Sequence, residues 1–164
     1  MTVVSSEKDV EALTLTFVAE FDAPVERVWQ LWEDPRQLER WWGPPTWPAT
    51  FDQHDFEVGG RSAYYMTGPD GEKARGWWEV TAIEPPYRLE FDDGFADDDG
   101  NPVDSLGITR AVVTFGTVDG KTRMTSVSSF ASADQLEKMM EMGMEEGMRE
   151  AIGQIDAILA EVPA

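Results

Sequence analysis

The sequence contains no cysteine and only one histidine, His54, in its 164 residues. The absence of cysteine excludes disulfides, thiol catalysis and cysteine metal sites. One histidine cannot form the histidine cluster of many metal sites, and it supplies at most one imidazole base. We therefore expect neither a metal nor a cofactor, and we assign no catalytic residue.

Positive charge is also scarce, with 13 Lys and Arg against 32 Asp and Glu and a formal net charge of −19. This charge repels phosphate backbones and anionic lipid, so we expect no nucleic-acid partner and no membrane-surface partner. We interpret the acidic excess as a solvated surface, although it would also suit a salty cytoplasm.

No apolar run is long enough to span a membrane, and the first residues lack the apolar core of a signal peptide. We therefore expect a cytoplasmic protein. Residues 1–12 show no periodicity and are expected to form a partly disordered leader. Residues 13–164 have the length of a single domain with a real hydrophobic core.

The end of the sequence predicts one long helix over residues 132–162. Ser132 followed by Gln135 is a capping-box start, and Pro163 follows the last periodic residue. Apolar residues recur at intervals of three and four along it: Leu136, Met140, Met144, Met148, Ile152, Ile155, Leu159 and Val162. A continuous helix of this length is about 45 Å long.

The remainder predicts a sheet preceded by two short helices. Alternating apolar residues indicate a first strand over residues 13–21, a helix follows from about Val25 to Asp34, and a second covers residues 36–42. Turn signals, among them Asp119-Gly120, then separate strands over residues 50–58, 61–67, 73–83, 87–91, 108–118 and 121–130. We predict an α+β fold in which a curved antiparallel sheet of six to seven strands surrounds the carboxy-terminal helix.

Four short motifs carry a resemblance to a known family: residues 21–29 (FDAPVERVW), residues 41–44 (WWGP), residues 59–61 (GGR) and residues 85–89 (PPYRL). Together they are similar to bacterial homologues of the activator of heat-shock protein 90 ATPase, in the START-like (SRPBCC) superfamily. The resemblance covers residues 13–162 and implies a helix-grip fold with a hydrophobic cavity. Met148 departs from the family, because related chains often carry tryptophan there.

Seven tryptophans and a methionine cluster in the last helix favour a ligand cavity, because aromatics and flexible methionines often line such sites. An ordinary core is the alternative for each of these residues. Alternation places Trp77 and Trp78 on opposite faces of the sheet, and we favour Trp78 as the inward one. The predicted lining is Trp29, Trp32, Trp42, Phe56, Tyr64, Met66, Trp78, Phe91, Phe95, Met140, Met144 and Met148.

Four polar residues are candidates for a hydrogen-bonding group inside the cavity: His54, Arg61, Arg75 and Glu79. For His54 we favour a position at the surface or sheet edge over a catalytic role. Residues 92–101 look like a calcium loop, but their glycine and glutamate spacing is wrong. We interpret this segment as a mobile acidic loop whose Phe95 closes the cavity as a lid.

Three functions are compatible with these features. We favour binding of a hydrophobic small molecule between the sheet and the last helix. A co-chaperone role follows from the family name, but the chain has no room for the second domain that the eukaryotic activator uses. A cyclase-like or aromatase-like enzyme is the third, and it requires His54, Glu79 or Arg61 to project into the cavity.

Overall fold

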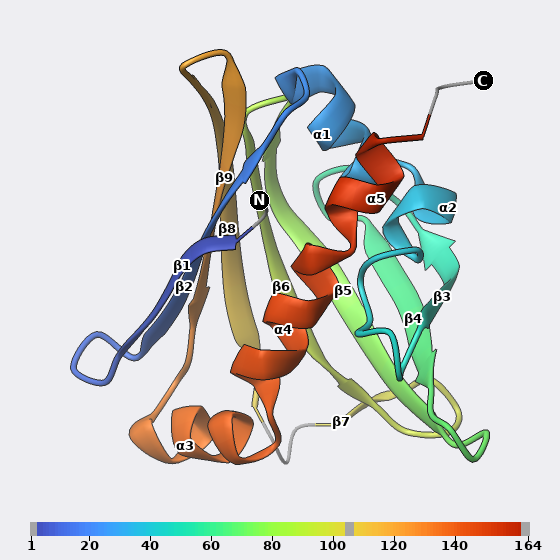
Figure 1. Ribbon diagram of the computed structural model, residues 1–164. Helices are drawn as coiled ribbons and strands as arrows, with labels where there is room; N and C mark the ends of the chain where they lie inside the picture. Colours follow the sequence, from blue (N-terminus) through green and yellow to red (C-terminus); the bar gives the residue numbers. More distant parts are fainter. Residues whose placement is uncertain (1–2, 104–106, 162–164) are drawn as a thin grey trace.

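The computed structural model describes residues 3–103 and 107–161, which form one strongly curved antiparallel sheet with helices on its concave face (Figure 1). The strands are β1 Val3–Asp9, β2 Thr14–Phe21, β3 Ala49–His54, β4 Arg61–Thr67, β5 Lys73–Glu84, β6 Arg88–Ala96, β7 Pro102–Val103, β8 Thr109–Val118 and β9 Lys121–Ser129. The helices are α1 Val25–Glu33, α2 Pro35–Leu38, α3 Ala133–Glu141, α4 Met144–Gly153 and α5 Ile155–Leu159. The predicted α+β helix-grip architecture is confirmed.

The strands lie in the order β1-β2-β9-β8-β6-β5-β4-β3, and β7 pairs with β6. Side chains alternate between the two faces of each strand, so strand β2 buries every second residue from Leu15 to Phe21. These inner-face residues pack against the helices and form one hydrophobic core. The curvature of the sheet leaves its concave face to be covered by helices from both ends of the chain.

The sheet has two more strands than the sequence predicts, because the prediction misses β1 and β7. The expectation of a partly disordered leader is wrong for Val3–Asp9, which pairs with β2 along its length. This pairing uses backbone groups, and the side chains of residues 5–9 are mostly exposed, so no apolar alternation marks the strand.

The predicted single helix over residues 132–162 is wrong. The chain forms three shorter helices, α3, α4 and α5, which Figure 1 shows as separate coils in orange and red. Gly143 adopts a left-handed backbone conformation with φ of 83°, which ends the first helix and turns the chain into the next. The predicted start is confirmed, because the Ser132 side chain accepts a hydrogen bond from the Gln135 amide. The predicted end at Val162 lies outside the described residues.

Two further predictions need correction. The second helix covers only Pro35–Leu38 instead of residues 36–42. Strand β6 continues to Ala96, paired with β5 to its end and with β8 as far as Asp93, so half of the predicted mobile acidic loop, residues 92–96, is a paired strand. The turn that follows it is held by the Asp97 carboxylate, which accepts hydrogen bonds from the amides of residues 99 and 101.

Across the described ranges, each helix is too short or too polar to traverse a lipid bilayer.

Candidate functional site

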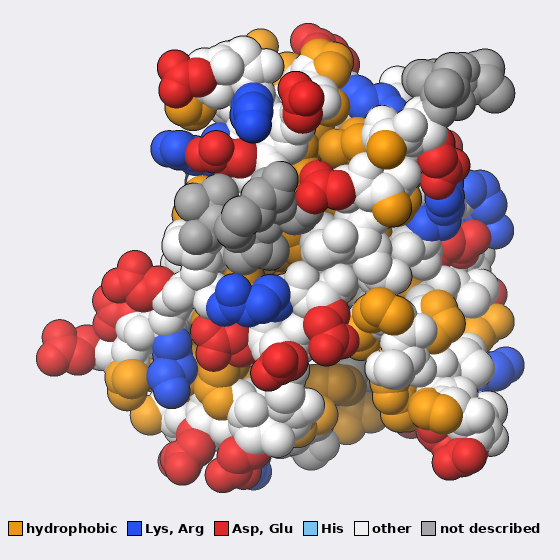
Figure 2. Space-filling view, in the orientation of Figure 1, with side chains coloured by type: hydrophobic (Ala, Val, Ile, Leu, Met, Phe, Trp, Pro, Cys, Tyr) orange, Lys and Arg blue, Asp and Glu red, His pale blue; other side chains and the backbone are white. Residues whose placement is uncertain are grey.

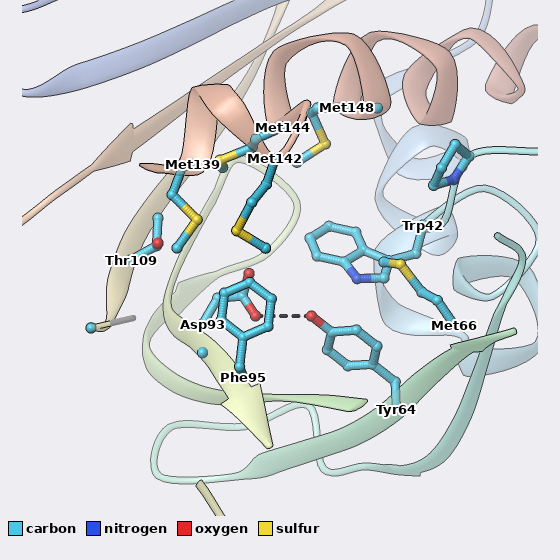
Figure 3. Close-up of a pocket in the computed structure, with 14 residues that line it drawn as sticks. Trp42, Tyr64, Met66, Asp93, Phe95, Thr109, Met139, Met142, Met144 and Met148 are labelled. Carbon is cyan, nitrogen blue, oxygen red and sulfur yellow. Dashed lines mark hydrogen bonds between the residues drawn. The ribbon is translucent and has the colours of Figure 1, made fainter. Parts of the chain in front are cut away.

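A pocket of about 260 Å³ lies between the inner face of the sheet and the helices α3 and α4 (Figure 3). It is open to solvent, and Figure 2 shows hydrophobic atoms gathered around a hollow between the carboxy-terminal helices and the lower part of the sheet. Its lining residues are Trp42, Pro44, Tyr64, Met66, Asp93, Gly94, Phe95, Gly107, Thr109, Met139, Met142, Met144, Gly147 and Met148.

Four methionines form the helical wall of this pocket. Met139 comes from α3, Met142 from the turn, and Met144 and Met148 from α4. The Met142 side chain is 57% exposed at the mouth, whereas Met139 is buried. Gly147 adds no side chain, and a Cβ placed there would meet nothing within 4 Å. Flexible thioethers beside open space make this wall deformable.

A hydrogen-bonded polar pair lies on the opposite wall. The Tyr64 hydroxyl of β4 donates to Asp93 Oδ1 of β6 over 3.0 Å, as Figure 3 shows. Tyr64 reaches across the intervening strand because its partner in β5 is Gly76, where a Cβ would lie 2.5 Å from the tyrosine ring and hydroxyl. The glycine therefore allows the tyrosine to lie across the sheet.

Removal from water governs the protonation of this pair. Burial raises the pKa of Asp93 from 3.8 to about 7, and the hydrogen bond from Tyr64 opposes this only in part. Burial, together with the neighbouring Asp93, raises the pKa of Tyr64 well above its ordinary value. The phenol is therefore protonated at neutral pH, while Asp93 lies near the midpoint of its titration.

Two amide side chains, the buried Gln135 and the half-buried Gln154, hold the walls in place. Gln135 in α3 accepts from the Ala131 amide and donates to the Ile108 carbonyl, which ties the helix to the start of β8. Gln154, between α4 and α5, donates to the Gly43 carbonyl over 2.7 Å and so fixes the loop that carries Trp42.

The structure brings six of the twelve predicted lining residues together at the pocket: Trp42, Tyr64, Met66, Phe95, Met144 and Met148. Phe95 reaches the pocket from strand β6, so the expectation that a mobile loop carries it over the cavity as a lid is wrong. Contact of these six residues with a ligand stays a prediction.

The other six predicted lining residues lie elsewhere. Five pack in or against the aromatic core rather than in the pocket: Trp29, Trp32, Phe56, Trp78 and Phe91. Trp78 does face inwards, but it is fully buried and stacks on the Phe91 ring at 4.2 Å between centroids. Met140 lies against a separate polar hollow with Lys8 and Arg149. Because the helix breaks at Gly143, Met140 and Met144 do not share one stripe.

None of the four polar candidates lines the pocket. His54 lies on edge strand β3, and its ring nitrogens contact the Trp32 carbonyl at 2.8 Å and the Ser62 hydroxyl at 2.7 Å. Burial lowers the pKa of His54. Its neutral ring therefore donates from Nε2 to the carbonyl and ties the sheet to α1.

The three charged candidates lie on the outer face of the sheet. Arg61 pairs with Glu79 at 3.0 Å, and the Arg75 guanidinium lies over the Tyr65 ring. Strand alternation already places these residues on the face of the sheet away from Tyr64 and Trp78, so the sequence was enough to exclude them from the cavity.

The predicted lining did not include Asp93, Thr109, Met139 and Met142, nor Pro44 and the three glycines, which come from different parts of the fold. Asp93 had a signal, because it continues the inward alternation of Leu89, Phe91 and Phe95. Thr109 faces Asp93 from the paired strand β8, which only the strand register reveals. Within residues 3–103 and 107–161, no three His, Cys, Asp or Glu side chains form a group that could hold a metal ion.

Comparison with known proteins gives the family of the chain. The family model for Activator of Hsp90 ATPase homolog 1-like protein matches residues 22–160. No protein of curated function matches the sequence.

Solved structures give the same fold. The solution NMR structure of a protein from Arthrobacter aurescens is 69% identical, with a TM-score of 0.94 over 99% of this chain and 94% of that one. A crystal structure from Mycobacterium smegmatis is 51% identical, with a TM-score of 0.91 and 99% of both chains covered. The AHSA1 protein from Silicibacter pomeroyi shares the fold at 24% identity, with a TM-score of 0.72 over 90% of this chain and 97% of that one. The chain therefore belongs to the Activator of Hsp90 ATPase homolog 1-like protein family.

Proposed function

We propose that this protein binds a hydrophobic small molecule in the pocket between the sheet and helices α3 and α4. The observation that carries the proposal is the lining: five methionines and the rings of Trp42 and Phe95 surround the hydrogen-bonded pair of Tyr64 and Asp93. Small-molecule sites typically combine a mostly apolar wall with a few polar groups that orient the ligand.

The pocket is a separate, solvent-open cavity and not a packing defect within the hydrophobic core. The aromatic core beside it is closely packed, with Trp42 and Trp78 rings in edge contact at 4.8 Å between centroids. The pocket itself lies beyond this core and reaches solvent at Met142. A ligand there would cover apolar surface that is otherwise left to water.

The residues named in the enzyme hypothesis do not face the pocket. The enzyme hypothesis relied on His54, Glu79 or Arg61, and these residues lie outside it. A chaperone partner stays a separate proposal, supported by the family name alone, and specific stoichiometric capture of a chaperone would be needed to prefer it.

A thermal-shift screen of lipids, aromatic polyketides and hydrophobic metabolites tests the proposal. A ligand at a hundred times its dissociation constant should stabilise the protein by about 2.7 kcal/mol. The site is assigned with Met144→Trp, which should fill the pocket and abolish the shift while leaving the unfolding midpoint nearly unchanged.

Met140→Trp is the matched control, because Met140 comes from the same segment but lies outside the pocket. It should keep the ligand-induced shift. If Met144→Trp itself destabilises the protein by about 1–3 kcal/mol, as overpacking of a filled core does, the pocket is not open space and the proposal is wrong.

A further inference from the structure

We propose that the ligand of this pocket is an apolar molecule carrying one protonated amine, and that the Asp93 carboxylate binds this amine as its counter-ion. The inference rests on the proposed function and deepens it by naming the chemical class of the ligand.

Asp93 has an oxygen available for such a contact. Oδ1 accepts from the Tyr64 hydroxyl, which among the described residues is the one side chain that bonds to the carboxylate, and the Gly94 backbone amide also donates to this group. A carboxylate has about four acceptor positions, so these two bonds leave room for a further donor. Figure 3 shows the second oxygen turned towards the side of the pocket where Met139 and Met142 lie. A ligand entering past the methionines therefore meets an acceptor at the base of the pocket.

The pocket supplies no positive charge of its own. Its described lining contains no lysine, arginine or histidine. Arg110, which is close in the sheet, pairs with Asp92 on the outer face at 3.1 Å. A carboxylate withdrawn from water without a counter-ion is costly, and a ligand ammonium group would offset this cost with charge and hydrogen bonds.

The surroundings also favour a cation over a neutral donor. The rings of Trp42, Tyr64 and Phe95 line the same pocket, and aromatic faces attract ammonium groups. The formal net charge of −19 raises the local concentration of cations around the whole molecule and repels anionic ligands.

Proton release on binding is a second property by which the proposed amine can be recognised. Asp93 and Tyr64 are the titratable groups in the described lining, and the paired residues on the flanking strands, Trp78 and Thr109, do not titrate. The pKa of Asp93 in the free protein is about 7 because of burial. Amine binding stabilises the carboxylate and lowers this pKa, so the complex releases a proton and its affinity rises as the pH increases through neutrality.

The test compares three ligands with one ring system: naphthylmethylamine, naphthylmethanol and naphthoic acid. Titration calorimetry at about pH 8 should show the amine binding about tenfold tighter than the alcohol, since a hydrogen bond to a charged partner is stronger than a neutral one. The acid should bind most weakly. Repeating the amine titration at about pH 6, in buffers of different ionisation enthalpy, should show weaker binding and proton release.

Asp93→Asn should remove the preference for the amine while keeping an oxygen for the Tyr64 hydroxyl. The matched control is Asp92→Asn, which makes the same charge change one residue away on the outer face and should keep the preference. If Asp93→Asn does not fold, the wild-type protein still tests the inference: proton release on amine binding supports it, and binding without proton release overturns it.

The outcomes separate the two proposals. Alcohol binding as tight as amine binding, or a preference that survives Asp93→Asn, overturns the amine inference and leaves the hydrophobic pocket as proposed. Failure of all three ligands to bind overturns the amine inference. The proposed function fails as well only if the thermal-shift screen finds no ligand whose binding is abolished by Met144→Trp.

Discussion

Replacing Asp93 with asparagine should make the protein more stable at neutral and alkaline pH. Asparagine has the same shape, and its side-chain oxygen still accepts from the Tyr64 hydroxyl, but it carries no charge to withdraw from water. The change therefore isolates the cost of ionising one carboxyl group inside the pocket.

The sign of the pH dependence follows from the direction of the pKa shift. Burial raises the folded-state pKa of Asp93 from 3.8 to about 7, so the folded protein holds this proton more tightly than the unfolded chain. The stability that the folded protein gains by holding this proton is fully present below about pH 4 and is lost as the pH rises towards 7. Three pH units at about 1.4 kcal/mol each set an upper value of about 4 kcal/mol. Because the pocket opens to solvent, water screens the carboxylate, and we expect about half of this upper value.

Urea titrations of wild type, Asp93→Asn and Asp92→Asn at about pH 5 and about pH 8 provide the measurement. The advantage of Asp93→Asn over wild type should grow by about 1–3 kcal/mol between the two pH values. Asp92 has an exposed ion pair with Arg110, so its variant should show little change. An advantage of Asp93→Asn that is the same at both pH values would refute the argument, and equal growth in both variants would assign the effect to overall charge.

Three glycine substitutions give further predictions, each measured by urea unfolding. Gly76→Ala should cost about 1–3 kcal/mol and, in NMR spectra, shift the Tyr64 ring, because the added methyl group would overlap it; an unmoved ring would contradict this. Gly143→Ala should destabilise by about 1 kcal/mol, because its φ of 83° disfavours a side chain. Gly147→Ala lies inside α4 with open space around it and should stabilise by about 0.5–1 kcal/mol; a loss of stability there would show that the wall is already filled.

Much of the sheet could be predicted from the sequence because its signals are local. The alternation of residues 13–21 predicts the inward face of β2, and strand β4 has the predicted bounds, Arg61–Thr67. Asp119 and Gly120 both have positive φ, as the two-residue hairpin predicted for them requires. The helix start at Ser132 is likewise a short-range contact between a side chain and the backbone. Each of these features depends on neighbours a few residues apart.

The pocket was decided by the tertiary structure. Alternation identifies Trp78, Phe91 and Phe95 as inward-facing, but it does not say which of them a helix covers. That depends on the path of α3 and α4, which turns at Gly143 and is fixed by side-chain contacts between segments distant in sequence. Strand β1 is paired through its backbone, and the pairing of Tyr64 with Asp93 needs two strands brought together across a third. Side-chain periodicity records neither kind of contact, so the core aromatics and the pocket aromatics look alike until the chain is folded.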